Sequence, residues 1–361
     1  MPLLVQNQAN QNSSGSAIRE DLADYIAIVD AKSCPLISQA PKGKDLGNMR
    51  FDWQVDSYAA PLLAGVMDGV DITVSSASNP VANRARQSNY AQAFRRDLRI
   101  GFIAETQNVA GVSDELASGI SKKLIEIKRD CEATFCCTNQ AAQIESGTAG
   151  SGGVPYLTSS LGNWITAAPA SGTTGVPAAY TGGDYGPASG AVTSTTSANL
   201  TEATVQNVLT AIYGATGVYR QYDCILGTTL KRAFTNLTAG GQALLNGAGT
   251  TNTYTQTAVR TFNKELDTDT FKSSIDIFVG DFGTLVLNPS TFIGGKTGTA
   301  LTSLAYKGYV IPMDMVEVRY AKLPEIKELP DAGGGPARLV QMIAGLVVKN
   351  AQGFGMFNGA S

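Results

Sequence analysis

The sequence predicts an α+β fold in which one long amphipathic helix lies against a β-sheet. Residues 113–139 place apolar side chains three and four positions apart, which is the spacing of one helix face. Residues 49–56 alternate apolar and polar side chains, as a half-buried strand does. Residues 201–237 show the succession of helix, strand and helix that is typical of a mixed α/β layer.

The helix predicted at 113–139 is the longest element of the chain. Ser113 is its expected N-cap, and Asp114 and Glu115 place negative charge in the first turn, where the helix dipole favours it. Roughly 27 residues correspond to a rod of about 40 Å. A rod with a single apolar stripe needs a broad surface to cover it. The stripe consists of Val112, Leu116, Ile120, Leu124, Ile127, Cys131 and Phe135.

Residues 49–100 predict a two-limbed β excursion with an acidic outgoing limb and a basic returning limb. An isolated hairpin is marginally stable in water, so we expect this excursion to lie on another subunit. The residues predicted to form inter-subunit contacts are Phe51, Trp53, Asp52, Asp56, Asp68, Asp71, Arg84, Arg86, Arg95, Arg96 and Arg99.

Two interpretations of the five arginines compete. One is contact with nucleic-acid phosphates. The other, which we favour because acidic residues are close by in the sequence, is ion pairing with a neighbouring copy or with the other limb. Exposed ion pairs contribute about 0–1 kcal/mol each, so they would set the register of partners more than the total stability.

Composition excludes several classes of enzyme. The 361 residues contain no histidine, which excludes Ser-His-Asp and Cys-His mechanisms and histidine-ligated metal sites. The net charge of −3 gives no overall nucleic-acid footprint. We therefore predict no enzyme, no catalytic residue, no cofactor and no metal. Carboxylate, lysine or tyrosine chemistry stays open, although no paired-carboxylate motif stands out.

The five cysteines are an odd number in a chain without an export signal, which favours free thiols over disulfides. For the three cysteines near 131–137, we favour simple burial as small apolar side chains, and metal binding is the alternative.

Lys296 lies near the end of a sequence that resembles a phosphate-binding loop. No convincing helix follows it, so an ordinary loop is the favoured interpretation. No apolar run reaches the roughly 20 residues of a membrane helix, and we expect a soluble protein made in the cytoplasm.

The remaining segments complete the order of elements. Residues 1–17 are polar and predict an extended or mobile arm, and residues 19–30 predict a short helix or arm segment that Pro35 ends. Residues 146–198 are rich in small residues, and Trp164 indicates short packed strands among loops. The later strands are predicted at 271–293, where Ile275, Ile277 and Val279 alternate, at 308–326 and at 337–357.

This order resembles that of the major capsid proteins of tailed bacteriophages with the Hong Kong 97-like fold, in particular the podovirus-like branch. The matching phrases span about residues 19 to 358. Two resemble the N-terminal arm, one the elongated loop, one the spine helix and two the strands that return from the axial to the peripheral domain. In that order they are REDLADYI, SCPLISQAPKGK, FDWQVDSYAAP, ISKKLIEIKRDCEAT, VGDFGTLVLNPSTFI and IPMDMVEVRYAKLP.

The resemblance implies a shell protein that assembles with itself into hexamers and pentamers. The shell would be icosahedral or prolate and would enclose double-stranded DNA, which it contacts non-specifically. Portal, scaffolding and decoration proteins would be further partners. The protein would be located in the virion capsid, which is assembled in the host cytoplasm. An encapsulin-type cellular nanocompartment is the alternative. The implied division of the chain is an arm at 1–48, an elongated loop at 49–100, a peripheral domain at 101–200 with the spine helix 113–139, an axial domain at 201–304 and return strands at 305–361.

Two departures from the family qualify this expectation. Some members join their subunits covalently through a lysine of the elongated loop, but no lysine occurs between Lys44 and Lys122. We therefore expect the strength of the shell to come from interleaved subunits or decoration proteins. The chain also has no long helical prefix before Arg19, so we expect no fused scaffolding domain.

Overall fold

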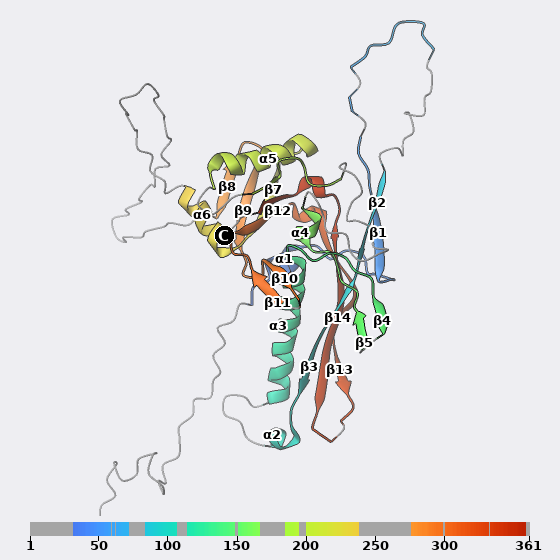
Figure 1. Cartoon of the computed structure of the whole chain (residues 1–361), viewed down its shortest axis with the longest axis vertical. Helices are drawn as coiled ribbons and strands as arrows, with labels where there is room; N and C mark the ends of the chain where they lie inside the picture. Colours follow the sequence, from blue (N-terminus) through green and yellow to red (C-terminus); the bar gives the residue numbers. More distant parts are fainter. Residues whose placement is uncertain are drawn as a thin grey trace, which may run out of the picture.

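The structure of the protein is a computed structural model with two main β-sheets and helices packed on each (Figure 1). The described residues are 32–58, 60–61, 63–71, 84–106, 114–148, 151–166, 185–194, 200–237, 276–298, 300–331 and 333–358. The predicted arm at 1–17 and helix at 19–30 lie outside them.

A three-stranded antiparallel sheet supports the long helix (Figure 1). Its central strand is β14 (Ala337–Val348), flanked by β13 (Val316–Leu329) and β3 (Gln92–Arg99). The helix α3 (Glu115–Phe135) packs along β3 and β14. The predicted arrangement of one long helix on a sheet is confirmed.

The ends of α3 differ from the prediction. The N-cap is Asp114, whose side chain accepts a hydrogen bond from a first-turn amide at 3.0 Å, so Ser113 as the cap was wrong. The helix ends at Phe135, four residues before the predicted end, because the chain turns away and the Thr138 amide donates to the Gly294 carbonyl at 2.9 Å. Its 21 residues give a rod of about 30 Å. The buried part of the predicted stripe is Ile127, Cys131 and Phe135.

A six-stranded mixed sheet forms the second part of the molecule. Two neighbouring pairs, β6–β15 and β7–β9, are parallel, and the others are antiparallel. Across the sheet the order is β6 (Val192–Thr193), β15 (Gly355–Asn358), β12 (Lys307–Ile311), β7 (Arg220–Leu226), β9 (Gly283–Pro289) and β8 (Ile277–Gly280).

Helices α5 (Glu202–Thr216) and α6 (Thr228–Leu237) share one core with one face of this sheet. Thr201 caps α5 as predicted, because its side chain accepts a hydrogen bond from the Thr204 amide at 3.2 Å. Gly217 ends α5 with φ 66°, a left-handed conformation that glycine adopts at little cost. The predicted inward residues of α5 are all buried: Val205, Val208, Leu209 and Ile212.

The opposite face of the six-stranded sheet joins the core beneath α3. Tyr309 of β12 is fully buried there, and its hydroxyl donates to the Cys136 carbonyl, at the end of α3, at 3.1 Å. The two sheets are therefore connected through one continuous apolar core. Its strand residues from the second sheet are Ile225, Tyr309, Ile311 and Met356.

Two predicted regions differ in detail from the expectation. The short strands predicted within 146–198 are present as β4 (Ser146–Thr148), β5 (Ser151–Val154) and β6, whereas Trp164 itself lies on a one-turn helix, α4 (Leu161–Trp164), and is fully buried in the core beneath α3. Ile277 and Val279 alternate as predicted, but they face solvent, because β8 is an edge strand with Phe278 packed on the core side.

No helix among the described residues combines the length and apolar content needed to cross a membrane.

The other described elements are short. They are α1 (Pro35–Gln39), β1 (Arg50–Val55), β2 (Ala85–Tyr90), α2 (Phe102–Thr106), β4 (Ser146–Thr148), β5 (Ser151–Val154), β10 (Gly294–Thr297), β11 (Ala300–Ser303) and the 3₁₀ turns Met313–Met315 and Ala351–Gly353.

Candidate functional site

The predicted outgoing limb is strand β1, which pairs antiparallel with β2 to form a hairpin beside the three-stranded sheet (Figure 1). Phe51 and Val55 are buried and Trp53 is half-buried, so the predicted alternation is confirmed. The returning limb in this pairing is 85–90. The next residue, Ala91, is fully buried and separates β2 from β3.

Phe51 and Trp53 pack within the subunit's own core. The Phe51 ring lies over Gly345, where a Cβ would come within 2.5 Å of it, and beside buried Val347. Trp53 stacks on Phe51 at 6.1 Å between ring centroids and contacts Trp164 at 5.3 Å. Both rings therefore attach the hairpin to the body of the same chain, and the predicted contact of Phe51 and Trp53 with another subunit stays a prediction.

The charges of the hairpin pair across its two limbs. Arg84 Nε lies 3.1 Å from Asp56, and Arg86 forms an ion pair with Asp52, which Arg50 also contacts at 3.2 Å. Burial opposes the ionisation of Asp52, but the hydrogen bonds from Arg86 and Arg50 outweigh it and hold its pKa below the ordinary value. These pairs agree with the favoured interpretation, ion pairing with the other limb.

Three predicted arginines lie elsewhere. Arg95, Arg96 and Arg99 belong to β3, in the sheet beneath α3, and not to the hairpin, although the prediction placed all of 49–100 in one excursion. Arg99 lies 3.8 Å from Asp331. Arg95 is exposed on the face away from α3 and has no ion pair among the residues that the structure describes. The sequence suggested one basic limb because the change of sheet at Ala91 carries no local signal.

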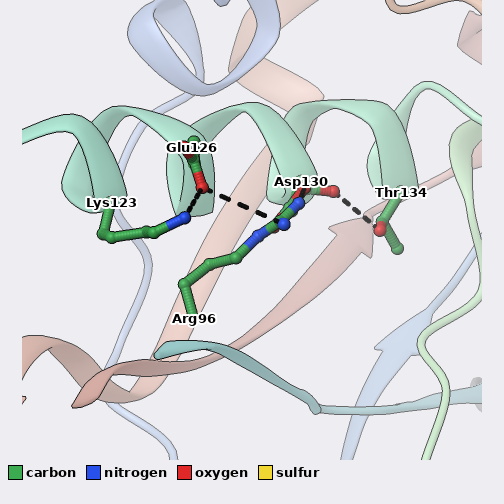
Figure 2. Close-up of polar contacts among 5 residues, drawn as sticks. All are labelled: Arg96, Lys123, Glu126, Asp130 and Thr134. Carbon is green, nitrogen blue, oxygen red and sulfur yellow. Dashed lines mark hydrogen bonds and ion pairs between the residues drawn. The ribbon is translucent and has the colours of Figure 1, made fainter. Parts of the chain in front are cut away.

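Arg96 instead joins β3 to the long helix (Figure 2). Its guanidinium makes two hydrogen bonds of 2.6 Å to Asp130 and lies 3.9 Å from Glu126. Lys123 contacts Glu126 at 2.8 Å, and the Thr134 hydroxyl donates to the Asp130 carbonyl. The hydrogen bonds to Asp130 raise the pKa of Arg96 above its ordinary value. This two-pronged pair fixes the position of the helix along the sheet.

Beyond the hairpin the chain projects away from the body as an extended segment (Figure 1). All described residues between Asp56 and Asp71 are exposed, including Asp68. Several of them are large and apolar. Met67 is 79% exposed, and Tyr58 and Leu63 are almost completely so.

A buried network of neutral side chains fixes the hairpin root. The Asn89 side-chain amide donates to the Leu346 carbonyl at 2.7 Å, to the Thr158 hydroxyl at 3.1 Å and to the Ser159 carbonyl at 3.4 Å. Its oxygen accepts from the Tyr90 and Ser159 amides, both at 2.8 Å. One amide thus joins β2, β14 and the segment before α4.

Two further amides extend this network. Gln140 donates to the Gln92 side chain at 2.9 Å and to the Thr158 carbonyl at 2.8 Å. Backbone pairing completes the root, since the Ala91 amide donates to the Met49 carbonyl at 2.8 Å. Sequence reasoning missed these residues because a buried asparagine or glutamine looks like any polar surface residue when its partners are far away in the sequence.

A buried charged residue attaches the segment before the hairpin to the body of the subunit. Glu132 of α3 is fully buried, and its carboxylate accepts the backbone amides of Leu36 and Ile37, both at 2.9 Å. These amides belong to the first turn of α1, which Pro35 begins. The signal that sequence reasoning missed is the position of Glu132, directly after Cys131 of the apolar stripe. A residue that faces solvent is not expected at that position.

Comparison with known proteins identifies the family. The model of the SU10 major capsid protein family matches residues 5–361. The chain belongs to this family. It is a major capsid protein of tailed-phage type, and such subunits associate with one another into capsid shells. The virion capsid is therefore its location.

Solved structures show the same Hong Kong 97-like fold. The capsid of a native GTA particle matches with a TM-score of 0.57 at 12% identity, covering 99% of this chain and 100% of that one. Gordonia phage Cozz matches with 0.53 at 13% identity over 99% of each chain, and Mycobacterium phage Bobi with 0.52 at 11% over 100% of each. No curated protein matches the sequence. The findings do not favour the encapsulin-type alternative.

Other candidate chemistry in this capsid protein has a structural explanation. Burial raises the pKa of the Cys34 thiol to about 11, and it also raises the pKa of the thiols of Cys131, Cys136 and Cys224. These thiols are therefore neutral, and they pack as apolar side chains. The described residues contain no group of three or more potential metal ligands. Lys296 lies in β10, paired with Leu301 of β11 and not at a helix N-terminus. The five free cysteines are Cys34, Cys131, Cys136, Cys137 and Cys224.

Proposed function

We propose that this capsid protein closes its shell by laying the segment 56–71 over a neighbouring copy. The observation that supports the proposal is the exposure of large apolar side chains along an extended segment that makes no core of its own. Burying one such side chain contributes about 1.5–3 kcal/mol. Repeated around a closed symmetric shell, contacts of this size add up to high avidity.

The finer organisation belongs to the same proposal. Capsomers are hexamers and pentamers, with 201–304 near the capsomer centre and the arm 1–48 crossing between subunits. The protein acts as a structural container and not as an enzyme, and it assembles in the host cytoplasm with portal, scaffolding and decoration proteins. Double-stranded DNA is contacted non-specifically by a wall whose chain carries a net charge of −3, which limits how firmly the wall grips a polyanion.

Removing apolar area from the projecting segment tests the proposal. The double variant Leu63→Ser, Met67→Ser changes two exposed side chains, so we expect an unchanged midpoint of unfolding for the soluble subunit and at least about a tenfold loss of closed particles in electron microscopy. The matched control is Leu63→Met, Met67→Leu, which keeps the apolar area and should assemble normally. Normal particle yield from the serine variant would contradict the proposal.

A further inference from the structure

The attachment of α1 to α3 contains a buried charge that the shell-forming contacts leave unexplained. Glu132 is fully buried, and its two carboxylate oxygens accept one backbone amide each, from Leu36 and Ile37. Cys34, the residue before α1, is 2% exposed beneath the same contact. A buried carboxylate is expensive unless its surroundings replace the water that it loses.

The groups around the carboxylate replace that water only in part. Lys128, on the same helix, is the cation that favours its ionised form, and Cys136 Sγ lies 3.7 Å from one oxygen. From the arm side it faces the neutral thiol of Cys34, and Cys131 lies beside it on α3. Burial raises the pKa of Glu132, and the two amide hydrogen bonds, the Cys136 thiol and Lys128 lower it again without cancelling the effect.

The rest of the contact combines the Leu36 side chain, fully buried in the core beneath α3, with a few hydrogen bonds of the arm root. Lys128 Nζ donates to the Ser38 hydroxyl at 3.0 Å. The following residues add to the side of β13, where the Gly43 amide donates to the Val318 carbonyl at 2.9 Å and the Val318 amide to the Pro41 carbonyl at 3.1 Å. Lifting the single turn of α1 would return the Glu132 carboxylate to water and expose Leu36, whereas the pairing of β13 with β14 does not involve α1.

We propose that the α1–α3 contact is a releasable joint, in which the buried Glu132 carboxylate makes docking of the arm root, residues 34–40, weaker when it is ionised than when it is protonated. The joint is a conformational device of the subunit itself, and it stands independently of where the segment 56–71 binds. It lets the path of the chain before the hairpin change while the sheet and the long helix stay in place.

The direction of the pH dependence follows from the raised pKa. A group whose pKa is higher in the closed state than in water stabilises that state fully below its ordinary pKa, and this stability is lost as the pH rises through the raised value. The joint should therefore be tightest in mild acid and open more often toward neutral pH. Each pKa unit by which the closed state raises Glu132 corresponds to about a tenfold change in the opening equilibrium.

Hydrogen exchange measured on the intact protein tests this joint, since protection factors correct for the intrinsic pH dependence of exchange. Between about pH 4.5 and 8, we expect the protection of 35–40 to fall by roughly tenfold in the wild type and to stay constant in Glu132→Gln. The peptide 87–92 of the hairpin root, held by neutral amides, is the internal control and should not change in either protein.

A second pair of variants keeps the test decisive if Glu132→Gln does not fold. Lys128→Gln removes the cation that favours the carboxylate, so the fall in protection should move to higher pH. Ser38→Ala removes the same lysine hydrogen bond but keeps the charge, and it should leave the position of the fall unchanged. Constant protection of 35–40 in the wild type, or an equal slope in Glu132→Gln, would overturn the proposal.

Discussion

The hairpin root and the arm root of this subunit are attached to its body by opposite chemistry. The hairpin root is fixed by Asn89 and Gln140, neutral amides whose hydrogen bonds do not respond to pH. The root of the arm is held by Glu132, a carboxylate that must be either buried as a charge or protonated. Hydrogen bonds to side chains hold both roots, but only the second can change its strength with pH.

The difference shows how one small subunit can combine a rigid and an adjustable attachment. A buried amide network is strong when every member has a partner, and it holds a single geometry. A buried carboxylate is close to balance, because desolvation opposes the hydrogen bonds that hold it. The hairpin thus leaves the body at a fixed angle, whereas the arm root is the place where the subunit can rearrange.

Breaking the apolar side of the hairpin root should have the largest effect. Phe51→Ala removes a buried ring from a site closed by Ala91, Val347 and Gly345, and should lower the free energy of unfolding of the soluble subunit by about 3–5 kcal/mol. Chemical denaturation measures this loss, and Phe51→Leu, which keeps most of the volume, is the matched control. A variant as stable as the wild type but unable to assemble would mean that Phe51 is an inter-subunit residue, as the sequence first indicated.

Placing a carboxylate in the hairpin root, as the arm root has, should lower the free energy of unfolding by a somewhat smaller amount. Asn89→Asp keeps the shape but removes the amide hydrogens that the Leu346 and Ser159 carbonyls accept, and it places a carboxylate beside these carbonyls. The free energy of unfolding should fall by about 2–4 kcal/mol at neutral pH. The pKa of the new carboxyl would be raised, so part of the loss should return in mild acid.

The control for this exchange is Gln54→Glu, which adds the same charge at an exposed position of β1. Its unfolding free energy should change by less than about 0.5 kcal/mol. If Asn89→Asp were equally harmless at every pH, the hairpin root would not depend on the amide network.

Local patterns predicted the elements that depend on neighbours in the sequence. The cap at Thr201 and the buried stripe of α5 could be read directly, because both repeat within one helix. The strand β1 was visible from its alternation. The shape of the hairpin root was not, because Asn89 meets Leu346, 257 positions away, and its role depends on that contact.

The misplaced arginines illustrate the same limit. Arg96 lies ten residues after Arg86, and both looked like parts of one basic limb. The change of sheet at Ala91 sends one to Asp130 of α3 and the other to Asp52 of β1. Charge patterns alone cannot decide between partners 34 positions apart in either direction, because that choice is made by strand pairing.

The most direct test of the account compares the projecting segment before and after assembly. Hydroxyl-radical labelling of Met67, which is 79% exposed in the lone subunit, is measured by mass spectrometry on unassembled protein and on closed particles. Met342, buried beneath α3, is the internal reference and should stay unlabelled in both. The account predicts that labelling of Met67 and Tyr58 falls at least about fivefold in the particles, because a neighbouring copy covers them. Equal labelling in both states would contradict it.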